Sequence, residues 1–194
     1  MQNEANPWTT LSSERLYEDS FVSFIKHIVR DASSKEIQYG VTHYKQIGIR
    51  ILPVDQGGHT WLVGQYRFAA GAYSWELPAG GGDPGEVPQK AAARELREEA
   101  GLEASSWLEI NRLVPAGSII DLREISYLAW DLRMTERDPD PQEVIKVMRL
   151  PFRDAFNMAL TGEITNAGTV ATILMAHAKA LRGELPDLIA QKLR

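Results

Sequence analysis

One stretch of the chain, residues 80–102, constrains its fold more than any other, because it sets a glycine-rich turn and a helix at a fixed spacing. Three consecutive glycines open it, and Asp83-Pro84-Gly85 follow. Pro88 suits the first turn of a helix, and Gly101 suits the position just beyond a helix end. The pattern therefore predicts a helix over Val87–Ala100 that the chain enters from a glycine-rich turn.

Three glutamates of this predicted helix fall on one face. Glu95, Glu98 and Glu99 are separated by three and four residues, a spacing that brings helical side chains together. Like charges at this spacing weaken a helix by about 0.2–0.5 kcal/mol per pair. A divalent cation removes the repulsion, and carboxylate oxygens are the ligands that Mg²⁺ prefers. Arg94 either neutralises part of the cluster or ties the glycine turn to the helix. On the three glutamates alone, a solvated acidic face is the commoner explanation, because glutamate-rich helices usually just face solvent.

A second pattern overlaps the glycine turn. Gly80, Gly82 and Gly85 satisfy G-x-G-x-x-G, which is typical of dinucleotide-binding proteins. Such a site needs a buried apolar strand before the first glycine, whereas Trp75-Glu76-Leu77-Pro78 precede it here. It also needs a helix N-terminus that can receive pyrophosphate, and Glu86 at that end would repel the anion. We therefore reject the dinucleotide interpretation.

The complete spacing resembles the Nudix box at each of its nine defined positions. These positions are Gly80, Glu86, Arg94, Glu95, Leu96, Glu98, Glu99, Gly101 and Leu102. Flanking segments are similar to the branch that hydrolyses ADP-ribose and nucleotide sugars. They are Gln65-Tyr66-Arg67, Trp75–Gly80, Pro115-Ala116-Gly117-Ser118 and Gly162–Thr169.

The resemblance implies a role for each matching residue. Glu95 and Glu99 would be the main metal ligands, Glu98 a further ligand, and the Ala79 carbonyl would complete a site for Mg²⁺ or Mn²⁺. Gly80, Glu86 and Arg94 would be structural. Substrate binding would fall to Arg67, Glu76, Gly117 and Ser118. The catalytic residues would be Glu98 and Glu143, with Glu143 orienting or deprotonating the attacking water; an ordinary solvent-exposed loop acid is the alternative for Glu143.

The activity implied by the resemblance is hydrolysis of the pyrophosphate bond of a nucleoside diphosphate sugar. ADP-ribose and GDP-mannose both stay open, because Pro115 and the Ile119-Ile120 pair depart from the ADP-ribose pattern, with Asp121 and Glu124 displaced from the expected acidic position. Hydrolysis of nucleoside triphosphates or diadenosine polyphosphates is an alternative enzymatic interpretation. A non-catalytic nucleotide-sugar sensor is a further one, but the box has lost no glutamate.

The remaining pattern predicts an α+β protein. We expect a Nudix-type α/β/α sandwich with a mixed central sheet over residues 46–194, and a small antiparallel β-rich extension over 1–45. Apolar alternation predicts strands near 20–30, 36–45, 47–54, 60–66, 74–77, 108–114, 124–131 and 143–150. Helical periodicity predicts two C-terminal helices that end at Gly162 and Gly183, and Pro186 opens a short last one.

Composition limits the partners and the compartment. The chain has 194 residues, a net charge of −5 and no cysteine. Without a basic run there is no footprint for nucleic acid, and no apolar stretch is long enough to span a membrane. The first seven residues lack the features of a signal peptide. These observations lead us to expect a cytoplasmic enzyme, and the resemblance implies a homodimer formed through the N-terminal extension.

Overall fold

The structure is a computed structural model that describes residues 5–138 and 144–194. The chain divides into two compact units. The first unit comprises residues 1–46 together with 114–122, and the second comprises 47–113 together with 123–194. The expected boundary near residue 45 stays a prediction about domains, and each unit is described by itself below.

The first unit is a three-stranded antiparallel sheet in the order β1-β2-β3. Its strands are β1 (Thr9–Glu18), β2 (Val22–Arg30) and β3 (Glu36–Tyr44). The segment 114–122 lies along β3, where Thr42 and Ile120 form a parallel bridge. The imidazole Nδ1 of His43 lies 2.6 Å from the Asp121 carboxylate, so side chains as well as backbone hold this segment to the sheet.

The strand β1 was not expected from the sequence. All ten of its residues are exposed, and its sequence mixes serine, threonine and charged residues without an apolar alternation. Its place in the sheet comes from backbone pairing with β2, with irregularities after Thr10 and Arg15. An edge strand that buries neither face gives no periodic signal, because that signal depends on burial.

The second unit is built around a four-stranded mixed sheet in the order β7-β4-β9-β8. A three-stranded antiparallel sheet, β10-β5-β6, completes its β structure. The strands are β4 (Ile47–Pro53), β5 (His59–Arg67), β6 (Ala72–Glu76), β7 (Ala79–Gly82), β8 (Leu102–Leu113), β9 (Glu124–Met134) and β10 (Lys146–Pro151). Its helices are α1 (Pro88–Ala100), α2 (Phe152–Thr161), α3 (Ala167–Leu181) and α4 (Asp187–Ala190).

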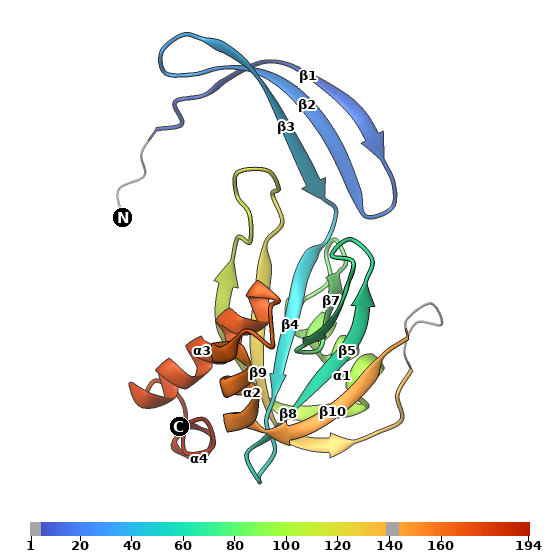
Figure 1. The fold of residues 1–194 in the computed structure, drawn as a ribbon, viewed down its shortest axis with the longest axis vertical. Coiled ribbons are helices and arrows are strands. Elements are labelled where there is room, and N and C mark those ends of the chain that lie inside the picture. The colour runs from blue at the N-terminus through green and yellow to red at the C-terminus, as the bar shows by residue number, and fades with distance from the viewer. Residues whose placement is uncertain (1–4, 139–143) are drawn as a thin grey trace. The chain divides into compact units, whose positions relative to one another are not determined.

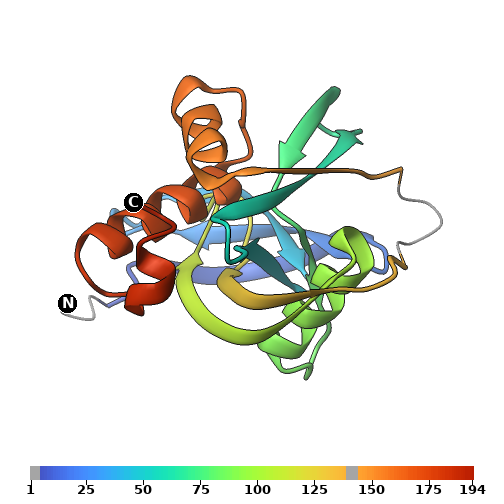
Figure 2. The ribbon, with the colours of Figure 1, turned by 90° about the horizontal axis from the view of Figure 1, so that it is seen from below.

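Side chains alternate across the central sheet and build one core on each face. Ile49 and Ile51 of β4 pack in a cluster with Ala92 and Leu96 of α1. Leu52 lies in the other cluster, with residues of α2, α3 and α4. Figures 1 and 2 show α1 on one side of this sheet and α3 on the other. The alternation of period two therefore produces a layered α/β/α arrangement.

Local signals place α1 where the sequence predicted it. Pro88 occupies the first turn, and Gly101 follows the last turn with φ 65°, a left-handed conformation that favours glycine. Two neighbouring elements differ from expectation. The glycine cluster that we expected to be a turn contains the short strand β7, and β8 begins at Leu102, earlier than the expected 108. Among the described residues, no helix is long and apolar enough to cross a membrane.

Candidate active site

The strand β7 and the helix α1 bring the glycine turn and the glutamate face together. A Cβ added to Gly80 would overlap the Glu95 carboxylate, so any side chain here would displace Glu95 from its position. The buried Glu99 carboxylate accepts a hydrogen bond of 2.8 Å from the backbone N–H of Ala79. Two glutamates of the helix therefore lie directly against the backbone of β7.

Arg94 connects the glycine turn to the helix through several hydrogen bonds. Its Nη2 donates to the Gly81 carbonyl at 2.7 Å and to Glu86 at 3.3 Å. Its Nη1 donates to Glu95 at 2.7 Å and to Glu98 at 3.2 Å. The guanidinium therefore neutralises part of the acidic cluster and also ties the turn to the helix, which are the two arrangements that its position suggested.

The same bonds favour the charged forms of Arg94 and Glu86. Burial lowers the pKa of Arg94, but its hydrogen bonds to Glu86 and Glu95 and their charges outweigh burial and raise the pKa. The hydrogen bond from Arg94 lowers the pKa of the Glu86 carboxyl. This part of the site therefore holds one cation against several carboxylates and keeps excess negative charge.

The donor set of this face fits a hard divalent cation. Glu95, Glu98 and Glu99 supply only oxygen ligands, and two of the three are almost fully buried at 9% and 2% exposure. Among the described residues, no three acidic, histidine or cysteine side chains lie in positions that could hold a metal ion. Arg94 engages Glu95 and Glu98 in this arrangement, so assembly of the metal site requires side-chain rotation and stays a prediction.

A second cluster of charges lies on the β5–β6 hairpin. Arg67 binds Glu76 through two parallel hydrogen bonds, from Nε at 3.0 Å and from Nη2 at 2.9 Å. Burial alone raises the pKa of Glu76, but the bonds to Arg67 and its charge lower it overall. Two residues expected to bind substrate are therefore joined as one rigid ion pair.

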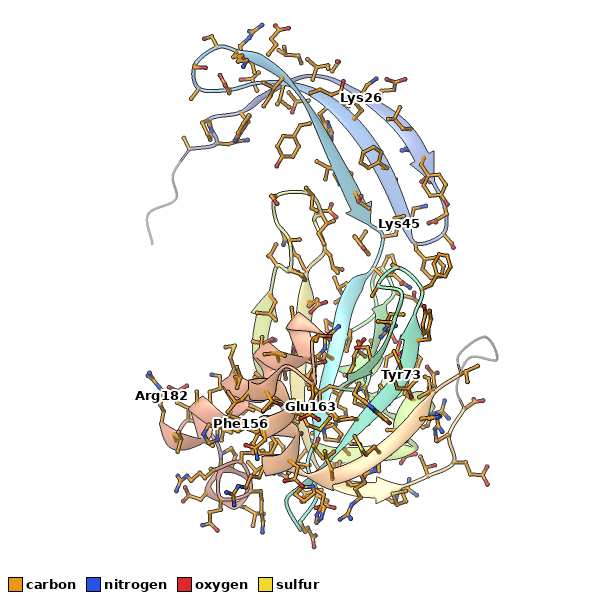
Figure 3. The ribbon with its side chains drawn as sticks, in the orientation of Figure 1. Lys26, Lys45, Tyr73, Phe156, Glu163 and Arg182 are labelled. Carbon is orange, nitrogen blue, oxygen red and sulfur yellow. The ribbon has the colours of Figure 1, made fainter. Side chains whose placement is uncertain are left out.

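This ion pair lines a cavity of about 330 Å³ that the sequence did not reveal. The cavity also contains Arg50 of β4 and Tyr73 of β6, together with Asn166 before α3. Figure 3 shows Tyr73 on the hairpin. The sequence held one signal for this cavity, which is the charged Arg50 in the middle of the apolar segment Ile47-Gly48-Ile49-Arg50-Ile51-Leu52. Arginine is rarely buried in a strand unless it has a partner.

The other expected site residues lie elsewhere. Gly117 and Ser118 belong to the first unit, where the Ser118 carbonyl accepts a hydrogen bond from the Tyr39 hydroxyl of β3. Glu143 lies outside the described residues. The expected roles of these three residues stay predictions.

Known proteins match both the sequence and the fold. The NUDIX domain model matches residues 44–172. An ADP-ribose pyrophosphatase of Mycobacterium tuberculosis is 35% identical over 172 residues, which cover 87% of this chain and 83% of that protein. An ADP-ribose pyrophosphatase of Bacillus subtilis is 28% identical over 176 residues, covering 88% and 92%. The crystal structure of an ADP compounds hydrolase superposes with a TM-score of 0.82 over 94% of this chain and 98% of that one, at 21% identity, a likeness that shows the fold.

The box and the layered core together define an α/β/α hydrolase. The chain belongs to the Nudix family. The predicted α+β fold and the predicted Nudix hydrolase are both confirmed. Nudix hydrolases generally use divalent metal ions, which agrees with the oxygen-only donor set on α1.

Proposed function

We propose that this enzyme hydrolyses the pyrophosphate bond of a nucleoside diphosphate sugar, of the ADP-ribose or GDP-mannose type, to a nucleoside monophosphate and a sugar phosphate. The observation that carries the proposal is the intact acidic face of α1, held against β7 by Gly80 and Arg94. Relatives named ADP-ribose pyrophosphatase align over most of the chain, which supports the choice of substrate class.

We assign the metal site to Glu95, Glu98 and Glu99 of α1 together with the Ala79 carbonyl, with Mg²⁺ as the ion and Mn²⁺ as a substitute. When bound, the cation lowers the pKa of a coordinated water and offsets charge that develops on the phosphoryl oxygens. Gly80 leaves the space that the Glu95 carboxylate fills. The bond between Arg94 and Glu86 fixes the turn beside the carboxylates.

The remaining residues bind and orient the substrate. The hydrogen bonds to Glu76 hold the Arg67 guanidinium in place. The Arg67 side chain is still 38% exposed, so it can contact a phosphate of the substrate. Gly117 and Ser118 contribute further substrate contacts in this proposal. Glu143 holds or removes the proton of the attacking water, with Glu98 as the second catalytic carboxylate.

Product chromatography tests this function. The protein and Mg²⁺ are incubated in parallel with ADP-ribose, GDP-mannose, UDP-glucose and ATP. We expect AMP plus ribose phosphate, or GMP plus mannose phosphate, and little loss of ATP. Consumption of ATP with the sugar nucleotides intact would replace the proposed substrate with a polyphosphate. Absence of turnover on all four would favour the sensor interpretation.

We further propose that the enzyme acts in the cytoplasm as a homodimer, without nucleic acid or membrane as a partner. The net charge of −5 supports the lack of a nucleic-acid partner. The exposed apolar residues of the first unit support dimerisation, because Trp8, Leu11, Leu16 and Tyr17 are each at least 40% exposed. Light scattering at working concentration tests this assembly, and a monomeric mass would contradict it.

A further inference from the structure

Arg50 is a buried arginine at a cavity that the proposed function does not yet use in full. The residue is only 5% exposed, and it lies on the central strand β4. Its Nη1 donates a hydrogen bond of 2.6 Å to Glu124 of the neighbouring strand β9. A Cβ added to Gly168 in the first turn of α3 would overlap the guanidinium. Strand, helix and carboxylate therefore hold the Arg50 head group in one position.

One donor of this fixed guanidinium is unused. The Nε–H of Arg50 is buried and has no hydrogen-bond partner among the described residues. A buried N–H without an acceptor is costly, and native proteins usually supply one from the protein, from water or from a ligand. Because Arg50 lines the cavity of about 330 Å³, an acceptor oxygen of a molecule in that cavity is the natural partner.

The charges around the cavity indicate what kind of molecule fits. Arg67 is paired with Glu76, and Arg50 is paired with Glu124, so two cations meet two carboxylates. The cavity as a whole therefore carries no surplus positive charge, and only the exposed part of Arg67 is left to meet a phosphate. The cavity offers donors and acceptors side by side instead, with the Tyr73 ring and the Asn166 side chain on the same cavity. Arginine, carboxylate, amide and aromatic groups around one cavity suit a neutral polyhydroxyl group.

We infer that this cavity receives the sugar of the nucleotide sugar and that Arg50 is a specificity-determining residue, donating a hydrogen bond to a sugar hydroxyl oxygen. The inference rests on the proposed function, because it assumes a substrate with a sugar beyond the pyrophosphate. In this inference Arg50 helps to determine which sugar the enzyme accepts. The residues of α1 carry out the cleavage of the pyrophosphate.

The test compares two ligands in metal-free buffer, where no turnover occurs. One is ADP-ribose. The other is ADP with a methyl ester on its terminal phosphate, which keeps the adenosine and the diphosphate and lacks the terminal ribose. Calorimetry gives the dissociation constant of each for the native protein and for Arg50→Lys. Lysine keeps a cation beside Glu124 and removes the Nε–H. Arg149→Lys is the matched control, because Arg149 pairs with Asp55 away from this cavity.

We expect Arg50→Lys to weaken ADP-ribose binding about tenfold, the scale of one hydrogen bond from a charged donor, and the methyl ester less than about twofold. The control should bind both ligands like the native protein. Equal losses on both ligands would show that Arg50 contacts phosphate or only supports the fold, and would overturn the inference. Unchanged binding of both, or equal affinity of the native protein for the two ligands, would overturn it as well. Product chromatography with Mg²⁺ judges the proposed function separately, since binding here is measured without turnover.

Discussion

Two charged clusters of the second unit use arginine in opposite ways. At α1, the single guanidinium of Arg94 bonds to three carboxylates, those of Glu86, Glu95 and Glu98. At the cavity, each arginine has a carboxylate of its own, Glu76 for Arg67 and Glu124 for Arg50. The first cluster is left with negative charge, and the second is neutral overall.

This difference indicates what each cluster binds. A site with surplus carboxylates gains most from an added cation, because repulsion between buried like charges is then relieved. A site with matched charges gains little from an ion and more from a neutral group that satisfies its hydrogen bonds. The comparison therefore separates the metal-dependent chemistry at α1 from substrate recognition at the cavity, and variants at each cluster should affect different measurements.

The largest expected effect belongs to Glu99→Gln. Removal of this carboxylate takes away a main ligand of the proposed metal site, so kcat should fall at least about a hundredfold. The amide can still accept the hydrogen bond from Ala79, so thermal unfolding should change little. Steady-state kinetics on ADP-ribose and a melting curve measure both effects. Glu103→Gln is the matched control, because Glu103 of β8 forms an ion pair with Arg133 of β9 that involves none of the three glutamates of α1. Full activity in the Glu99 variant would refute the metal assignment.

Arg67→Ala should affect both binding and stability. It leaves the Glu76 carboxylate buried without its main partner, at a cost of about 3 kcal/mol in the free energy of unfolding, and it should raise KM about tenfold. A second substitution, Glu76→Gln, should restore most of the stability without restoring KM. Urea unfolding and kinetics of both variants measure the split. If the double variant recovered the native KM, Arg67 would be a structural residue rather than a binding one.

Mg²⁺ should raise the free energy of unfolding of the protein, and this gain should depend on the glutamates of α1 and not on Arg50. At a Mg²⁺ concentration about a hundred times its dissociation constant, the native protein should gain about 2.7 kcal/mol over the protein in EDTA. Glu99→Gln should lose this gain, whereas Arg50→Lys should keep it, since Arg50 belongs to the neutral cluster. Thermal unfolding with and without Mg²⁺ measures the difference. Equal stabilisation of all three proteins would mean that the cation binds elsewhere.

Sequence reasoning reached the α1 cluster more completely than the cavity, and the reason is the range of the contacts. Pro88, Gly101 and the glutamate spacing act within one helix, so local rules were enough to place them. The bond between Arg50 and Glu124 joins residues 74 positions apart and depends on the parallel register of β4 with β9. No local pattern gives that register. Hydrophobic periodicity also could not predict which carboxylates Arg94 bonds to. It could not predict the strand β1 either, because all residues of β1 are exposed.

The smallest expected effect is a pH dependence of the neutral cluster. The folded protein holds the pKa of Glu76 below its usual value, so the unfolded chain takes up protons first as the pH falls. The stability that this carboxylate contributes is therefore complete above its unfolded pKa of about 4.3, and it is lost as the pH falls through the lower folded pKa. We expect the difference in unfolding free energy between native protein and Glu76→Gln to shrink by roughly 1 kcal/mol between pH 7 and pH 3. Urea titrations of both proteins at the two pH values measure it, with other acidic groups cancelling in the comparison. A difference that stayed constant would mean that folding leaves the pKa of Glu76 unchanged, and the ion pair with Arg67 would then not stabilise the ionised carboxylate on which the charge balance of the cavity rests.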